Sequence, residues 1–289
     1  MPIDLRAATD FMTTHARMID RRRFDHVLGR GDVDATLAAV DAYRNSDGGY
    51  GWGLEPDLRA KESQPGGALH AFEVFAEIAP ALTPRAAQLC DWLESVTLPD
   101  GGLPFALPIA EPAGCAPFWA QADPTTSSLQ ITSVIAANAH RVAAVDPAVA
   151  DHPWLQRATE YSLQACRSVD EHTHAIELAF AVQFVSVVHD TYPEAPEILA
   201  HLGSFVPGDG IKQVAGGAAD EVMRALDFAP MPGPGRKLFA PAVIDTELRR
   251  LADQQQDDGG WEVDFGSFSP AAALEWRGYA TVRAVRSLQ

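Results

Sequence analysis

The sequence lacks the cysteine patterns that cross-link a small fold or bind zinc. Its three cysteines, Cys90, Cys115 and Cys166, lie far apart and include no CxxC pair. Neither a disulfide framework nor a cysteine zinc cluster is therefore indicated. GxSxG nucleophile patterns and glycine-rich phosphate loops are also absent. Serine-nucleophile chemistry and phosphate-loop binding are not indicated either.

Basic residues and long apolar runs are scarce as well. Lys and Arg number 22 against 39 Asp and Glu, and the formal charge of −17 would repel nucleic acid and anionic lipid. No run of about 18 apolar residues occurs, since even AIELAFAVQFVSVV contains Glu177 and Gln183. The opening MPIDLRAATDF has no basic region followed by an apolar one. We therefore expect a cytoplasmic protein with no integral membrane segment, no nucleic-acid partner and a neutral or cationic ligand.

Helical periodicity dominates what is present. Of the 289 residues, 47% are apolar and 21% charged, which is enough for one large core. Apolar residues recur at three- and four-residue spacing in most segments, DEVMRALDF among them, and few windows alternate with period two. This pattern predicts about ten to twelve helices and little or no sheet. TSSLQITSVIAANAHRV and HAIELAFAVQFVSVV are apolar nearly all round, whereas VIDTELRRLADQQ has one apolar stripe, so we expect two concentric layers.

An internal repeat links the helices. Asp-Gly-Gly turns occur in YRNSDGGYGW, TLPDGGLPF and QQQDDGGWEV, and each follows an amphipathic helix. Each then leads through an aromatic segment to a polar residue and a proline, at Pro65, Pro124 and Pro270, where an inner helix should begin. Gly101 follows Gly48 by 53 residues, and that period implies about five or six helical hairpins. The three inner helices should start at the same end of the molecule.

The last turn carries a family resemblance. Gln255, Gly259 and Trp261 form a QxxxGxW pattern that resembles the QW repeat of squalene and oxidosqualene cyclases and of protein prenyltransferase beta subunits. The whole chain, with NSDGGYGWGLEPDLR and SPAAALEWRGYATV, also resembles bacterial proteins that carry prenyltransferase and squalene-oxidase repeats. The resemblance implies a single all-α domain over residues 1–289, an alpha-alpha toroid. In such a fold these three residues mainly pack one repeat against the next.

The chemistry of those families is only partly represented in this chain. The DxDD acid segment of class II terpene cyclases is missing, and Cys115 and Cys166 have no DxC context for the prenyltransferase zinc site. The nearest acid is Asp123 in ADPTTSS, which we expect to cap the start of an inner helix. A cap carboxylate accepts backbone N–H bonds, so its pKa should be lowered, which suits a cap better than an acid. No metal or cofactor is expected.

Other candidate acids lie where loops enter the inner helices. Glu55, Asp57 and Arg59 form a charged cluster in GLEPDLR, and Glu275, Trp276 and Arg277 form another. Glu55 or Asp57 could act as an acid or base or orient a cationic or hydroxylated ligand, or each arginine could simply join a loop to a helix by ion pairs.

A third candidate group lies near residue 174. His172, His174 and Glu177 superficially suggest a metal site, but residues two apart on a helix do not share a face. Glu177 remains of interest because it interrupts an apolar helix, where an unpaired carboxylate is costly. We therefore treat Glu177 as a candidate acid and His174 as a candidate ligand contact.

The loops are also rich in aromatic residues. We expect a central cavity with aromatic walls and an acidic mouth, in which some rings contact a ligand or stack on a cation and others belong to the core. The candidate catalytic residues are Asp57, Glu55, Asp123 and Glu177. The candidate substrate-binding residues are Trp52, Arg59, Phe118, Trp119, His174, Phe265, Phe268, Glu275 and Trp276.

Three functions remain open at this point. The favoured one is a terpene-cyclase-like protein that binds, and cyclises or isomerises, a small hydrophobic isoprenoid. The alternatives are a toroid protein that binds or scaffolds without catalysis, and a carbohydrate-active enzyme that uses paired carboxylates. The fold alone does not choose among them.

Overall fold

The computed structural model describes residues 3–289 as an all-α protein, which confirms the predicted fold class. Within this range there are fourteen α-helices, and eleven of them are nine or more residues long, in keeping with the expected ten to twelve. The other three are single turns: α6 (Pro117–Ala120), α8 (Pro147–Ala150) and α12 (Ala225–Phe228). A 3-10 helix, η1 (Pro234–Leu238), precedes the last two long helices, and one antiparallel hairpin joins β1 (Lys212–Gln213) to β2 (Val222–Met223).

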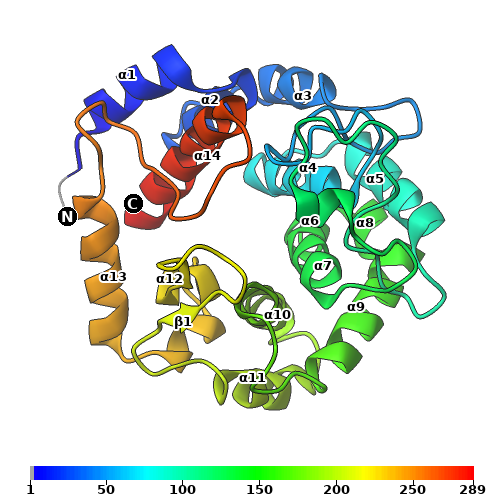
Figure 1. Cartoon of the computed structure of the whole chain (residues 1–289). Coiled ribbons are helices and arrows are strands. Elements are labelled where there is room, and N and C mark those ends of the chain that lie inside the picture. The colour runs from blue at the N-terminus through cyan, green and yellow to red at the C-terminus, as the bar shows by residue number, and fades with distance from the viewer. Residues whose placement is uncertain (1–2) are drawn as a thin grey trace.

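The helices alternate along the chain between a peripheral and an inner layer (Figure 1). The peripheral helices are α1 (Leu5–His15), α3 (Val33–Asp41), α5 (Pro84–Val96), α9 (Pro153–Cys166), α11 (Ala195–Gly203) and α13 (Pro241–Asp253). The inner helices are α2 (Met18–Val27), α4 (Pro65–Glu77), α7 (Leu129–Ala143), α10 (Ala175–Val188), α12 and α14 (Pro270–Leu288). In the part of the chain that the structure describes, these helices do not form a closed barrel. The inner layer includes α12, which is only four residues long and approaches α14 through Asp227 and Arg283, 3.6 Å apart.

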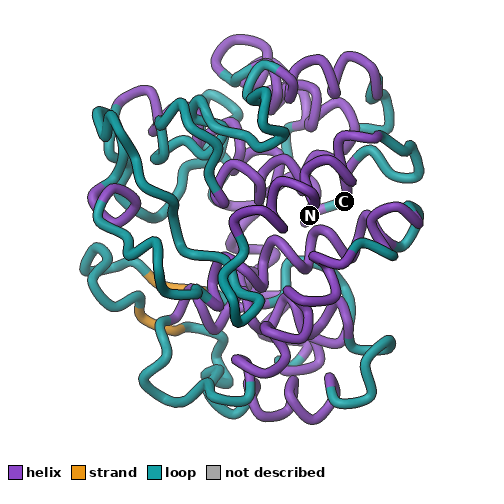
Figure 2. Tube along the Cα trace, turned by 90° about the vertical axis from the view of Figure 1, so that its right-hand side faces the viewer, coloured by secondary structure: helices purple, strands orange, loops and turns teal. Residues whose placement is uncertain are grey.

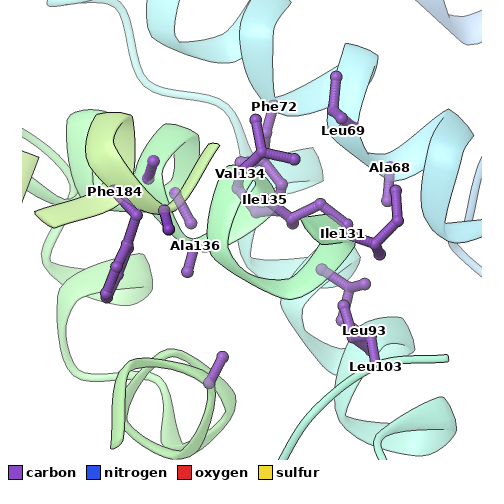
Figure 3. Packing of buried hydrophobic residues seen from close by; sticks show 14 of the residues in the cluster. Ala68, Leu69, Phe72, Leu93, Leu103, Ile131, Val134, Ile135, Ala136 and Phe184 are labelled. Atoms are coloured by element: carbon purple, nitrogen blue, oxygen red, sulfur yellow. The ribbon is translucent and has the colours of Figure 1, made fainter. Parts of the chain in front are cut away.

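The main hydrophobic core lies around α7, which packs against α4, α9 and α10. Eleven of the fifteen residues of α7 are buried, as its apolar sequence predicted, whereas α13 buries only Ile244, Glu247 and Ala252. Figure 3 shows Ile131, Val134 and Ile135 of α7 close to Phe72 and Ala68 of α4. Burying a side chain such as Phe72, which is 0% exposed, contributes about 1.5–3 kcal/mol.

The three Asp-Gly-Gly turns share one conformation. Gly48, Gly101 and Gly259 have φ of 93°, 93° and 90°, which favours glycine. In each turn an aspartate accepts a bond from the backbone N–H two residues later, at 3.0–3.1 Å. In the first two turns the same aspartate oxygen also accepts from a serine hydroxyl, 2.6–2.7 Å away, near the start of the next inner helix. The predicted repeat is therefore a real structural unit.

The last turn joins the two ends of the chain. The Gln255 side chain accepts a bond from the Asp4 backbone N–H (2.8 Å) and donates to the carbonyls of Asp4 (2.9 Å) and Gly259 (3.0 Å). Trp261 is 1% exposed, and its indole N–H donates to the Leu251 carbonyl at 2.7 Å. A Cβ on Gly259 would lie 2.1 Å from the backbone of α1. Gln255, Gly259 and Trp261 have the packing role that the repeat implied.

The long loops that precede α4, α7 and α14 gather on one face of the molecule, on the left of Figure 2. The loop before α4 contacts the other two: the Ala116 N–H donates to the Asp57 carbonyl (2.8 Å), and the Phe268 N–H donates to the Asp57 carboxylate (3.1 Å). The starts of α4 and α14 therefore lie at the same end, as predicted. We call this the loop end.

Two sequence predictions about helices are wrong. The inner helix expected at Pro124 begins at Leu129, because Ser127 pairs in an extended bridge with Pro104 and Ser128 is the N-cap. DEVMRALDF is not one helix, because Val222 and Met223 pair with the strand at Lys212–Gln213. Only residues 225–228 remain helical there. In both places, backbone pairing with another segment replaces local helical preference.

A helix that crosses a bilayer must be both long and apolar. None of the helices within residues 3–289 satisfies both requirements.

Candidate functional site

The loop end brings together the first and last charged clusters of the sequence. Asp57 lies in the loop before α4, while Phe268 lies just before α14 and Trp276 lies within it. The Phe268 N–H donates to Asp57 Oδ1 (3.1 Å), and the Trp276 indole N–H donates to Asp57 Oδ2 (2.7 Å). Two segments more than 200 residues apart in the chain thus meet at one carboxylate.

All hydrogen-bond donors to the buried Asp57 carboxylate are neutral. It is 3% exposed, and within residues 3–289 no Lys, Arg or His nitrogen lies within 4.0 Å of its carboxylate. Burial raises the pKa of Asp57 above its ordinary value and outweighs the Trp276 and Phe268 N–H bonds, which lower it. Asp57 is therefore easier to protonate than an exposed aspartate.

Glu55 has a different environment, because it is paired with a histidine. Its Oε2 lies 2.7 Å from Nε2 of His70, and its Oε1 accepts a bond from the Asp57 backbone N–H (3.1 Å). The second ring nitrogen of His70, Nδ1, lies 3.1 Å from Glu73. Burial alone would lower the pKa of His70, but the Glu73 charge and the bonds to both carboxylates raise it to about 9. At neutral pH an imidazolium therefore lies between Glu55 and Glu73, with both ring nitrogens donating.

Beyond Glu73, further charged and polar side chains of α2, α4 and α14 contact one another. The Tyr279 hydroxyl donates to Glu73 (2.7 Å), and Arg23 lies 3.1 Å from Glu73 and 2.7 Å from Glu77. The guanidinium charges hold the pKa of Glu77 below its ordinary value, although burial raises it. We call this set the central ion network; its members are Glu55, His70, Glu73, Glu77, Arg23, Tyr279 and Arg286.

Sequence reasoning found only Glu55 among the members of this network. A signal was present, since His70, Glu73 and Glu77 follow one another at three and four residues in an otherwise apolar helix. That spacing places them on one helix face. The segment was predicted only as an inner helix beginning near Pro65, without the charges that meet this face.

Aromatic side chains pack around Trp276, whose indole N–H donates to Asp57. Trp276 meets Phe265 and Tyr279 edge to face, with ring centroids 5.2 and 5.3 Å apart, and His70 lies 6.1 Å from Trp276. Phe118 of α6 meets Phe268 at 5.5 Å, and these two side chains are 51% and 50% exposed. The rings therefore extend from buried Asp57 to solvent.

Trp119 forms the inner edge of this aromatic group. It stacks on Phe105 with centroids 4.3 Å apart, and it is 8% exposed. Its indole N–H is buried and has no hydrogen-bond partner within the described chain. A buried donor without a partner is costly.

Arg59 and Glu275 pair with each other at 2.8 Å, and Arg17 lies 3.9 Å from Glu275. Arg59 thus joins its loop to α14, as the ion-pair interpretation expected, but its partner is neither Glu55 nor Asp57. Arg59 also lines a cavity of about 200 Å³ together with Lys61, Glu62, Ala110, Glu111 and Ala113.

The remaining predicted site residues take part in local structure. Trp52 is 51% exposed, and its indole N–H donates to Asn45 at the first glycine turn (2.8 Å). Asp123 is exposed and caps a turn, not a helix, which corrects our expectation. It accepts from the Thr125 N–H (2.8 Å) and from the Thr125 and Thr126 hydroxyls, and these bonds lower the pKa of Asp123 as predicted.

The third candidate group lies at the start of α10. Glu177 is half-buried in its first turn, and burial raises the pKa of Glu177. His174 caps α10: its Nδ1 accepts from the Ile176 N–H (3.4 Å), and its Nε2 donates to the Ala215 carbonyl (3.0 Å). Among the described residues, no group of three or more His, Cys, Asp or Glu side chains could hold a metal ion.

The sequence was also compared with known proteins. No protein-family model matches the chain, and no curated protein is significantly similar to it. The case for a function therefore depends on the geometry of the loop end.

Proposed function

We propose that the chain binds a small apolar, isoprenoid-like molecule at the loop end and that Asp57 acts as its acid. We further propose that the two-layer arrangement is a variant of the alpha-alpha toroid and that the chain is terpene-cyclase-like. The alternation of peripheral and inner helices and the three equivalent glycine turns support the toroid proposal. The observation that carries the functional proposal is Asp57, a buried carboxyl group with neutral donors only, one of which is the Trp276 indole that packs against Phe265.

The chemistry would be protonation of a carbon–carbon double bond. The proton passes from the Asp57 carboxyl group to one alkene carbon, and the other carbon becomes a cation. The faces of Trp276 and Phe265 would stabilise this cation. Loss of a proton from a neighbouring carbon back to the carboxylate would then give an isomerised alkene. A carboxyl group with a raised pKa suits this role because its acid form persists closer to neutral pH.

Access to Asp57 would require movement of the segment around Phe268. The Phe268 N–H bond covers Oδ1, and its half-exposed ring packs on Phe118. The two exposed rings would receive the apolar body of the ligand first. Glu55 would have a positioning role, because its carboxylate accepts a hydrogen bond from the Asp57 backbone N–H and is itself paired with His70.

The proposal is tested by incubating the full chain with farnesol in D₂O and measuring deuterium in the recovered alkene by mass spectrometry. We expect incorporation with wild-type protein and none with Asp57→Asn, while both bind farnesol, as followed by tryptophan fluorescence. Asp123→Asn is the matched control and should behave as wild type. Farnesol binding without deuterium incorporation would refute the acid role, and absence of binding would refute the ligand class.

One observation favours a second candidate, a binding protein without catalysis. Both Asp57 oxygens accept N–H bonds, an arrangement that stabilises the ionised form. In that case the carboxylate would receive a hydroxyl or a cationic group of the ligand. Farnesol binding that weakens in Asp57→Asn, with no deuterium incorporation by either protein, would favour this candidate.

A further inference from the structure

A basic groove lies between α1 and α2, apart from the loop-end site. Although the formal charge of the chain is −17, three arginines follow one another at positions 21–23. Arg23 joins the central ion network, but Arg21 and Arg22 line a cavity of about 240 Å³ together with Arg30. We call this cavity the α1–α2 groove. Its electrostatic character is opposite to that of the protein as a whole.

One face of each helix forms the groove. Met18, Arg21, Arg22 and Asp25 recur on α2 at helical spacing, and Thr9, Met12 and Thr13 do so on α1. Apolar side chains supply part of the lining: Met12 and Phe24 are each 2% exposed, whereas Met18 is 54% exposed. The groove therefore combines an apolar floor with cationic side chains.

The positive charge in the groove is only partly neutralised. Arg30 pairs with Asp25 at 2.9 Å. Within the described part of the chain, neither Arg21 nor Arg22 has a carboxylate oxygen within 4.0 Å. Arg21 donates to the Ala16 carbonyl (2.9 Å), while Nε of Arg22 is buried without any hydrogen-bond partner. A buried charged donor without an acceptor is destabilising, so an anion at this place would stabilise the protein.

We propose that the α1–α2 groove binds a small molecule with an oxyanion head, a carboxylate or phosphate, and a short apolar tail. A guanidinium group presents a rigid fork of N–H donors that matches such oxyanions. Met12, Met18 and Phe24 would contact the tail, and methionine adapts its shape to apolar ligands. This site is independent of Asp57, since it lies between other helices and needs no proton transfer.

Calorimetric titration of the full chain with matched probes tests the proposal. Octanoate and octyl phosphate carry both features, octanol lacks the charge, and inorganic phosphate lacks the tail. We expect at least one octyl anion to bind at least about tenfold more tightly than octanol and inorganic phosphate. Whichever anion binds more tightly identifies the head group. Added salt should weaken its binding.

Arg22→Gln should weaken binding of the preferred octyl anion by about tenfold or more, and Arg22→Lys should restore only part of it, because lysine lacks the fork. Arg249→Gln, an exposed arginine of α13, is the matched control and should bind as wild type. Urea unfolding should show that all variants are folded. Undiminished binding by Arg22→Gln, equal binding of octanol, or no binding of either octyl anion would overturn the proposal.

Discussion

Replacing Glu55 and Asp57 in turn separates a structural carboxylate from a functional one. Glu55 faces the His70 imidazolium, whereas Asp57 has neutral donors only. We therefore predict that Glu55→Gln destabilises the fold and that Asp57→Asn does so little. The two variants should differ because neither carboxylate has an arginine nitrogen within 4.0 Å in residues 3–289, and only Glu55 has a histidine partner.

The size of the Glu55 effect follows from the pKa of His70. Its rise from 6.5 to about 9 is the net result of burial, which lowers it, and of the two flanking carboxylates, which raise it, and corresponds to about 3 kcal/mol of net stabilisation. Glu55 and Glu73 share this amount, and a glutamine at position 55 would still accept the His70 N–H. We expect Glu55→Gln to lower the free energy of unfolding by about 1–2 kcal/mol at pH 6.

The two effects at Asp57 oppose each other. Asparagine would turn its amide group toward one of the two N–H donors and lose that bond, which costs about 1–2 kcal/mol. It would also remove a buried charge that destabilises the folded state at neutral pH, as the raised pKa of Asp57 indicates. We expect a net change within about 1 kcal/mol of zero.

The pH dependence gives the sharper measurement. Because the folded pKa of His70 lies above its unfolded value, the imidazolium stabilises the fold fully below about pH 6.5, and this contribution is lost as the pH rises through about 9. The difference between wild type and Glu55→Gln in urea unfolding should therefore shrink between pH 6 and pH 10 at constant m-value. It should also disappear in a His70→Gln background. A Glu55→Gln cost that is absent at pH 6, or unchanged at pH 10, would refute the imidazolium pairing.

Three further predictions concern single side chains. Trp276→Phe removes the indole N–H that donates to Asp57. The pKa of the Asp57 carboxyl group should then rise further in an NMR titration, and the free energy of unfolding in urea should fall by about 1–2 kcal/mol. Gly259→Ala should lower the free energy of unfolding in urea by at least about 2 kcal/mol, since the φ of Gly259 is 90° and an added Cβ would meet the α1 backbone. Gly266→Ala is the control: an added Cβ there would meet open space, so the change should be nearly neutral. Phe72→Ala should cost about 3–5 kcal/mol, and a loss below 1 kcal/mol would contradict its place in the core.

The helices and glycine turns were predictable because their signals are local. Apolar spacing identified most of the long helices, although not α2 or α11, and each Asp-Gly-Gly sequence contains the donors, acceptors and glycine that its turn needs. The predicted helix boundaries were wrong where contacts with another segment of the chain determine the backbone conformation. Ser127 is held extended by Pro104 and by the Asp100 carboxylate, so α7 starts later than its sequence suggests.

The candidate site was predictable only in part, for the same reason. The sequence identified Asp57 and Trp276 as members of two charged clusters, but nothing in either segment shows that they meet across 219 residues. The central ion network was missed because the charges on α4 become meaningful only when Arg23 and Tyr279 face them. Local patterns identify candidate residues, whereas tertiary packing determines their partners.

The partners of each buried charge distinguish structural from functional candidates in this protein. A buried ion pair is costly to break, so residues such as Glu77 and Arg23 are explained by each other and need no ligand. Asp57 and Arg22 are not explained in this way, because no opposite charge lies within 4.0 Å of either in residues 3–289. The lack of an opposite charge beside Asp57 and beside Arg22 is a cost that a ligand can offset. The same physical argument therefore points to a proton-donating carboxyl group at the loop end and to an oxyanion-binding guanidinium in the α1–α2 groove.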